Sequence, residues 1–130
     1  MLGTTCRIAP QKKLEELLDA LRLALPRMPA CGCVLKIAGG VEARADDYAA
    51  EMRARSADLP VEWLGEMADV RPLLRELDVF VMISEPAGCP NASLEAMAAA
   101  LPVIATDFGG ASEQVRQPRV FVSQPHAYRH

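Results

Sequence analysis

The residues best suited to hold an anion lie at the start of one predicted helix and after the first predicted strand. Asn91 follows Pro90 where a helical pattern begins, and the unpaired N–H groups and dipole of a helix start attract phosphate. Gly88 would let a ligand approach the backbone. Arg7 and Lys12 flank a turn, and two cations facing a helix start could clamp a diphosphate. A structural reading stays open, because asparagine caps many helices that bind nothing and Lys12 could be simply solvated.

Glu95 lies one turn further along the same predicted helix. Its carboxylate could accept hydrogen bonds from two hydroxyls, such as the vicinal diol of a ribose. An acidic residue in a first helical turn also suits the helix dipole, so a structural role fits equally well. The pairs Gly39-Gly40 and Gly109-Gly110 belong to neither G-x-G-x-x-G nor G-x-x-x-x-G-K-[ST], which disfavours a dinucleotide fingerprint or a P-loop.

The cysteines and histidines do not follow a metal-binding pattern. Cys31 and Cys33 form C-x-C where zinc ribbons and redox motifs have C-x-x-C, and no histidine lies near them. His126 and His130 both stand in the last few residues. We therefore expect thiols without partners and no metal site.

Length and composition indicate one folded domain. The chain has 130 residues, of which 51% are apolar and 24% charged, which suits a single hydrophobic core. A formal net charge of -3 provides no general field for nucleic acid or anionic lipid, so no nucleic-acid partner is expected. The apolar stretches fall short of the roughly 20 residues that span a bilayer. The N-terminus lacks the basic-then-apolar order of a secretory signal. We expect no integral membrane segment and a cytoplasmic location.

Strand-like and helix-like segments alternate along the chain. Residues 34–38 form a continuous apolar run before a glycine pair, as in a strand buried on both faces. From residue 14 to residue 25, leucines recur on one helical face. The predicted strands are residues 4–8, 34–38, 61–64, 79–83, 103–106 and 120–122. The predicted helices are residues 14–25, 46–56, a short one capped by Asp69, 91–100, and a turn at 112–115.

This alternation predicts a doubly wound α/β domain, with a parallel sheet of about five to six strands covered on both faces. In such sheets ligands bind outside the carboxyl ends of the strands. The rule assigns the functional edge to five loops, residues 7–13, 39–46, 65–69, 84–91 and 107–113. Nearly all the residues that could do chemistry fall in these loops.

Two segments resemble a known family. SEPAGCPNASLEAMA at 84–98, followed by LPVIATD at 101–107, Gly109-Gly110 and Glu113, resembles the donor half of family-four retaining glycosyltransferases of the GT-B fold. RIAPQK at 7–12 resembles the first strand and turn of that half. The likeness extends over about residues 4–115 and implies a Rossmann-like C-terminal domain that uses no metal and no cofactor. It predicts a donor-binding domain at 1–117, incomplete at its C-terminus, with 118–130 as a possible last strand and a non-matching tail.

The resemblance implies roles for the residues at the functional edge. Arg7 and Lys12 would hold the donor diphosphate, assisted by the N–H groups near Asn91 and Ala92. Glu95 matches the second Glu of the family's E-x7-E motif, which holds the ribose. The residues implied near the donor sugar or its loop are Glu85, Gly88, Gly109 and Gly110, and those bordering the base are Leu64 and Gly65, in the loop 64–69.

The sequence departs from the family pattern at three positions. The first Glu of E-x7-E falls on Ala87, so the usual carboxylate contact to the donor sugar is missing, and Glu85 is the nearest acid. Ala100 and Cys6 stand where the family usually has glycine, before Leu101-Pro102 and Arg7 respectively.

The expected function is binding of a nucleoside-diphosphate sugar for retaining sugar transfer. The acceptor would be held by an acceptor-binding domain or a partner chain outside this sequence. Two alternatives stay open. One is a catalytically inactive nucleotide-binding module, which Ala87 and the short length favour. The other is a GT-B epimerase of nucleotide sugars, which the Pro90-Asn91 and Glu95 segment fits less well.

Overall fold

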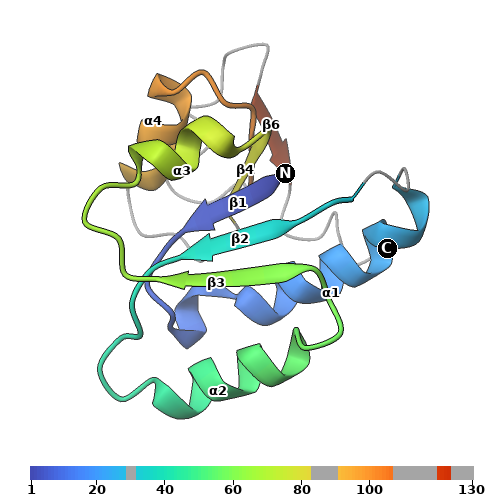
Figure 1. Cartoon of the computed structure of the whole chain (residues 1–130), viewed down its shortest axis with the longest axis vertical. Coiled ribbons are helices and arrows are strands. Elements are labelled where there is room, and N and C mark those ends of the chain that lie inside the picture. The colour runs from blue at the N-terminus through green and yellow to red at the C-terminus, as the bar shows by residue number, and fades with distance from the viewer. Residues whose placement is uncertain (29–31, 83–90, 107–119, 124–130) are drawn as a thin grey trace.

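A computed structural model describes residues 1–28, 32–82, 91–106 and 120–123, with backbone alone at residues 11, 91–94, 105–106 and 120–123. Its centre is a parallel sheet of six strands in the order β3-β2-β1-β4-β5-β6 (Figure 1). The strands are β1 (Leu2–Thr5), β2 (Leu35–Ala38), β3 (Val61–Gly65), β4 (Val79–Met82), β5 (Val103–Thr106) and β6 (Val120–Ser123). All pairings are parallel, as predicted from the continuous apolar strands.

Helices cover both faces of the sheet. Figure 1 shows α1 and α2 on one face and α3 and α4 on the other. The helices are α1 (Leu14–Ala24), α2 (Asp46–Arg55), α3 (Arg71–Glu76) and α4 (Asn91–Ala98), with 3-10 turns η1 (Pro10–Lys12) and η2 (Leu25–Arg27) beside α1. The predicted doubly wound α/β architecture is confirmed. The predicted first helix continued to residue 25, but α1 ends at Ala24 because the chain tightens into η2 at Leu25-Pro26.

The prediction for the first strand was wrong at both ends, since β1 is Leu2–Thr5 and not residues 4–8. Backbone pairing defines this strand more than its side chains do, because Leu2 pairs with Leu35 on one side and Val79 on the other. Ile8, which the sequence placed in the strand, lies beyond it and forms an isolated parallel bridge with Val41.

Each face of the sheet has its own apolar core. On the first face, four leucines of α1, Leu14, Leu17, Leu18 and Leu21, are buried together with Leu35, Ile37, Ala49 and Met52. Burying each leucine contributes about 1.5–3 kcal/mol before conformational entropy is subtracted. On the second face, Phe80 and Val103 are fully buried against Leu73, Leu74, Leu77 and Ala96. The two cores hold the strand ends at one edge in fixed relative positions.

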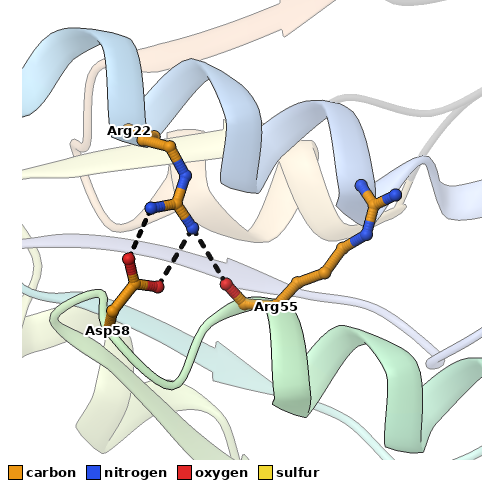
Figure 2. A network of polar contacts seen from close by, with 3 residues as sticks. All are labelled: Arg22, Arg55 and Asp58. Carbon is orange, nitrogen blue, oxygen red and sulfur yellow. Dashed lines mark hydrogen bonds and ion pairs between the residues drawn. The ribbon is translucent and has the colours of Figure 1, made fainter.

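A polar network joins the C-terminal ends of α1 and α2 on the first face (Figure 2). The Arg22 guanidinium donates to both carboxylate oxygens of Asp58, at 2.5 and 3.0 Å. It also donates to the Arg55 carbonyl oxygen at 3.0 Å, which is one of the carbonyls that a helix end leaves without an intrahelical partner. All three side chains are exposed. The network therefore links the ends of the two helices far from the carboxyl edge of the sheet.

Candidate functional site

The order of the strands creates a switch point between β1 and β4. From β1 the chain proceeds outward through β2 to β3, then returns to the other side of β1 and continues through β4 and β5 to β6. In open α/β sheets, ligands bind in the crevice outside the carboxyl ends at such a point. The loop that carries Arg7 and Lys12 follows β1, and α4 follows β4. The two predicted anion-binding features therefore flank the switch point.

The loops after β1 and β2 lie in close contact. The N–H of Cys6 donates to the Ala38 carbonyl at 3.0 Å, and the N–H of Ile8 donates to the Gly40 carbonyl at 2.9 Å. Gly39 has φ +149°, and a Cβ at this position would stand 1.6 Å from the carbonyl oxygen of Cys6. Gly39 therefore has a specific steric role, because it allows the loop bearing Arg7 to pass.

Arg7 and Lys12 are both available on this loop. Arg7 is exposed, and Lys12 is half-buried at the end of η1. Within the described part of the chain, neither side chain forms a hydrogen bond or an ion pair with another residue. Burial raises the pKa of the nearby Cys6 thiol to about 11, and the charge of Lys12 opposes that rise. The loop after β1 thus carries two cations that have no anionic partner among the described residues.

The end of β3 contains an irregularity at the residues predicted to border a base. Ile37 pairs with Trp63 and Ala38 with Gly65, so Leu64 has no partner in the register. Leu64 is 38% exposed. Gly65 has φ +73°, and its carbonyl accepts the N–H of Gly39 at 2.8 Å. A bulge next to a site typically redirects one side chain, and here that side chain is Leu64.

A groove of about 1060 Å³ lies between the loop after β3, α3 and α4. Glu95, the residue predicted to hold the ribose, is exposed and lines this groove. Among the described residues, the groove is lined by Met67, Ala68, Asp69, Val70, Arg71, Leu74, Arg75, Glu95 and Ala98–Ala100. Arg7 and Lys12 are not among them.

Asp69 and Arg71 form an ion pair in this groove. The Arg71 guanidinium donates through Nε at 2.9 Å and through a terminal nitrogen at 3.0 Å. Asp69 Oδ1 also accepts the backbone N–H of Arg71, the first residue of α3, at 3.0 Å. The predicted cap is displaced by one residue, because Val70 occupies the N-cap position and Asp69 precedes it. The hydrogen bonds from the Arg71 side chain and backbone hold the pKa of Asp69 below its ordinary value.

The sequence reasoning missed the part of the groove formed by α3. Arg71 and Arg75 are spaced i, i+4, which places both on one face of α3. That spacing is visible in the sequence. The small residues Ala98–Ala100, which line the opposite wall, gave no signal of their own.

Several predicted site residues cannot be located. α4 begins at Asn91 as predicted, but the structure describes only the backbone of Asn91 and Ala92. Glu85, Ala87, Gly88, Gly109 and Gly110 fall outside the described residues altogether.

Three further findings apply to the part of the chain that the structure describes. Cys6 and Cys33 are free thiols. No three His, Cys, Asp or Glu side chains gather there in a metal-binding arrangement. None of the helices there has the length and apolar character needed to cross a bilayer.

The fold and the switch point define a Rossmann-like nucleotide-binding class of α/β domain. Residues 1–128 match the family model described as Glycosyl transferases group 1, and the chain belongs to this family. The resemblance seen in the motifs is thereby confirmed at the level of family and fold.

Relatives agree with this assignment. The chain is 30% identical over 118 residues to the lipopolysaccharide core biosynthesis mannosyltransferase LpsB of Rhizobium meliloti (strain 1021), covering 88% of this chain and 33% of LpsB. It is similar to Alr3699/HepE of Anabaena, solved in complex with UDP and glucose, with TM-score 0.85, 26% identity, and coverage of 98% and 35%. It also matches the C-terminal domain of the group 1 glycosyltransferase LpcC from Francisella tularensis, with TM-score 0.81, 25% identity, and coverage of 98% and 69%. The chain thus spans about a third of the curated relative.

Proposed function

We propose that this chain is the donor-binding domain of a retaining glycosyltransferase and that it binds a nucleoside-diphosphate sugar. One observation carries the proposal: the loop with Arg7 and Lys12 and the helix α4 flank the switch point of the sheet. A diphosphate there would meet two cations on one side and the N–H groups of a helix start near Asn91 and Ala92 on the other.

The groove beside α4 is the proposed site of the nucleoside. Glu95 would accept hydrogen bonds from the two ribose hydroxyls, as its place in the groove allows. The base would lie toward the loop after β3, where Leu64 is exposed and Met67–Val70 line the groove. The structural likeness to Alr3699/HepE, whose complexes contain UDP and UDP-glucose, supports a nucleotide at this edge.

The chemistry proposed for this half concerns the leaving group. In sugar transfer the bond between the anomeric carbon and the phosphate oxygen breaks, and negative charge develops on the departing diphosphate. Arg7 and Lys12 would stabilise that charge, an effect that is strongest when donors are already in place before the reaction. The acceptor and the opposite wall of the cleft would come from an acceptor-binding domain or a partner chain. No residue of this chain is assigned to the attacking step.

A second candidate function is a nucleotide-binding module without turnover. Ala87 favours it, because the family usually has an acid against the donor sugar at that position. If this chain is such a module, a nucleoside diphosphate and its sugar conjugate should bind with affinities within a few-fold of one another. That corresponds to a difference in binding free energy of under about 1 kcal/mol. Ala87→Glu should then increase the preference for the conjugate. The family match favours either of these functions over the epimerase alternative.

Two assays test the proposal. A thermal-shift screen against uridine, guanosine and adenosine diphosphates should raise the melting temperature with at least one ligand, because a ligand that binds only the folded state stabilises it. No shift with any diphosphate would contradict the proposal. Incubation with a labelled donor then tests the second function, since hydrolysis or transfer by this chain would contradict a module without turnover.

A further inference from the structure

The N-terminus of α1 is held by a side chain from another helix. α1 begins at Leu14, directly after the turn η1 that carries Lys12. Lys13, the residue between them, is in the left-handed region with φ 56°, and its side chain does not cap the helix. The backbone N–H of Leu14 instead donates to the Tyr48 hydroxyl oxygen at 3.1 Å. Tyr48 belongs to α2 and lies 34 residues away in the sequence.

The Tyr48 hydroxyl is oriented by a second contact. It donates its proton to Glu15 Oε2 at 2.5 Å, which leaves its oxygen lone pairs for the N–H of Leu14. The group is partly buried, and burial together with the hydrogen bond to Glu15 raises the pKa of Tyr48, so it stays protonated at neutral pH. The same hydroxyl therefore serves as acceptor for the helix start and as donor to the residue that follows it.

We propose that Tyr48 is a positioning residue for Lys12, acting through the junction of η1 and α1; this rests on the proposed role of Lys12 in holding a diphosphate. The turn itself is short, closed by backbone bonds from Lys12 to Ala9 at 3.0 Å and from Lys13 to Pro10 at 3.2 Å. Leu14 directly follows Lys13, the residue with the left-handed backbone. The hydrogen bond to the Leu14 N–H therefore fixes the direction of η1 relative to α1. Tyr48 thereby determines where the half-buried Lys12 presents its charge.

The chain offers a matched control at the opposite ends of the same two helices. Arg22 links α1 to Asp58 and to the end of α2 (Figure 2), without touching η1. Tyr48→Phe and Arg22→Gln each remove polar contacts between the α1 and α2 regions. Only the first removes a contact next to Lys12. A purely structural role for Tyr48 would make the two variants behave alike toward ligands.

The experiment is a double-mutant cycle on the full chain, with UDP, GDP and the matching nucleosides titrated by calorimetry. The diphosphate that binds best to the wild type is used throughout. We expect Tyr48→Phe to weaken the diphosphate about three- to tenfold and the nucleoside less than about twofold. In a Lys12→Ala background, Tyr48→Phe should cause no further loss. Arg22→Gln should leave both affinities unchanged.

The outcomes separate this inference from the proposed function. If Lys12→Ala does not weaken the diphosphate, the proposed role of Lys12 fails, and the inference fails with it. If Lys12→Ala weakens it but Tyr48→Phe has no effect, or has the same effect with and without Lys12, the proposed role of Lys12 stands and the positioning role of Tyr48 is overturned. Glu15→Ala, which removes the acceptor that orients the hydroxyl, gives a second test and should act in the same direction as Tyr48→Phe.

Discussion

The carbonyl oxygen of Cys6 occupies the space that a side chain on Gly39 would need, 1.6 Å from the position of its Cβ. The loops after β1 and β2 can pass one another only because residue 39 has no side chain. The left-handed φ of +149° at Gly39 adds a second requirement for glycine. Since Arg7 immediately follows Cys6, this contact places the first proposed diphosphate ligand.

Gly39→Ala should therefore damage both stability and ligand binding. We expect a loss of about 3 kcal/mol or more in the free energy of unfolding, because a Cβ would collide with backbone and not with a flexible side chain. Gly40→Ala is the matched control, because the nearest atoms to its added Cβ belong to Glu66, at 3.6 and 3.7 Å. Urea denaturation of both variants measures the difference. Equal stabilities would show that the two loops can separate without cost.

Ala100→Gly should stabilise the protein. Ala100 has φ 62° and ends α4 in a Schellman arrangement, with its N–H donating to Met97 at 2.9 Å and the N–H of Leu101 donating to Ala96 at 3.1 Å. An alanine in the left-handed region costs roughly 1–2 kcal/mol, which glycine avoids at some cost in chain entropy. We expect a net gain of about 1 kcal/mol, or about 3 °C in Tm.

The control for this prediction is Ala98→Gly, at the last residue of α4. Glycine there should destabilise by about 0.5–1 kcal/mol, since the backbone at Ala98 is helical. Thermal unfolding followed by circular dichroism compares the two variants. A Tm for Ala100→Gly at or below that of the wild type would mean that the left-handed conformation at Ala100 costs little.

Stability should fall in alkaline solution through Cys6. Burial raises the pKa of this thiol from 9.0 to about 11, so below about pH 9 the thiol is protonated in both states and its contribution is fully present. Between about pH 9 and 11 the unfolded chain ionises while the folded chain does not, which lowers stability by up to about 1.4 kcal/mol per pH unit. Cys6→Ala should reduce this loss, whereas Cys33→Ala should keep it. Urea midpoints measured from pH 8 to 11 that fall equally in both variants would argue against the assignment.

Glu95→Gln should distinguish ribose from deoxyribose ligands. If the carboxylate accepts hydrogen bonds from both hydroxyls, its loss should weaken a ribonucleoside diphosphate about tenfold and the 2′-deoxy analogue much less. Calorimetric titration of both ligands into both proteins gives the comparison. The same loss for the two ligands would leave Glu95 as an acidic residue that only suits the dipole of α4.

The sequence was sufficient for features that repeat locally and insufficient for those that depend on distant contacts. The leucines of α1 and the continuous run of β2 predicted a helix and a strand whose ends agree with the structure within one residue. β1 was misplaced because Gly3-Thr4-Thr5 has no apolar pattern, and pairing with two neighbours makes it a strand. Tyr48 and Gly39 gave no local signal of their roles, since each acts on a segment more than thirty residues away.

The central claim is that Arg7 and Lys12 hold the diphosphate of a nucleotide. Calorimetric titration of UDP and GDP, each against its nucleoside, into the wild type, Arg7→Ala and Lys12→Ala tests it most directly, with the exposed Arg27→Ala as control. Each charge-assisted contact is worth about 1.5–3 kcal/mol, so either substitution should weaken the diphosphate about tenfold or more. The nucleoside should be affected little, and Arg27→Ala should change neither. Diphosphate affinities that survive both substitutions, or that fall together with those of the nucleoside, would contradict the account.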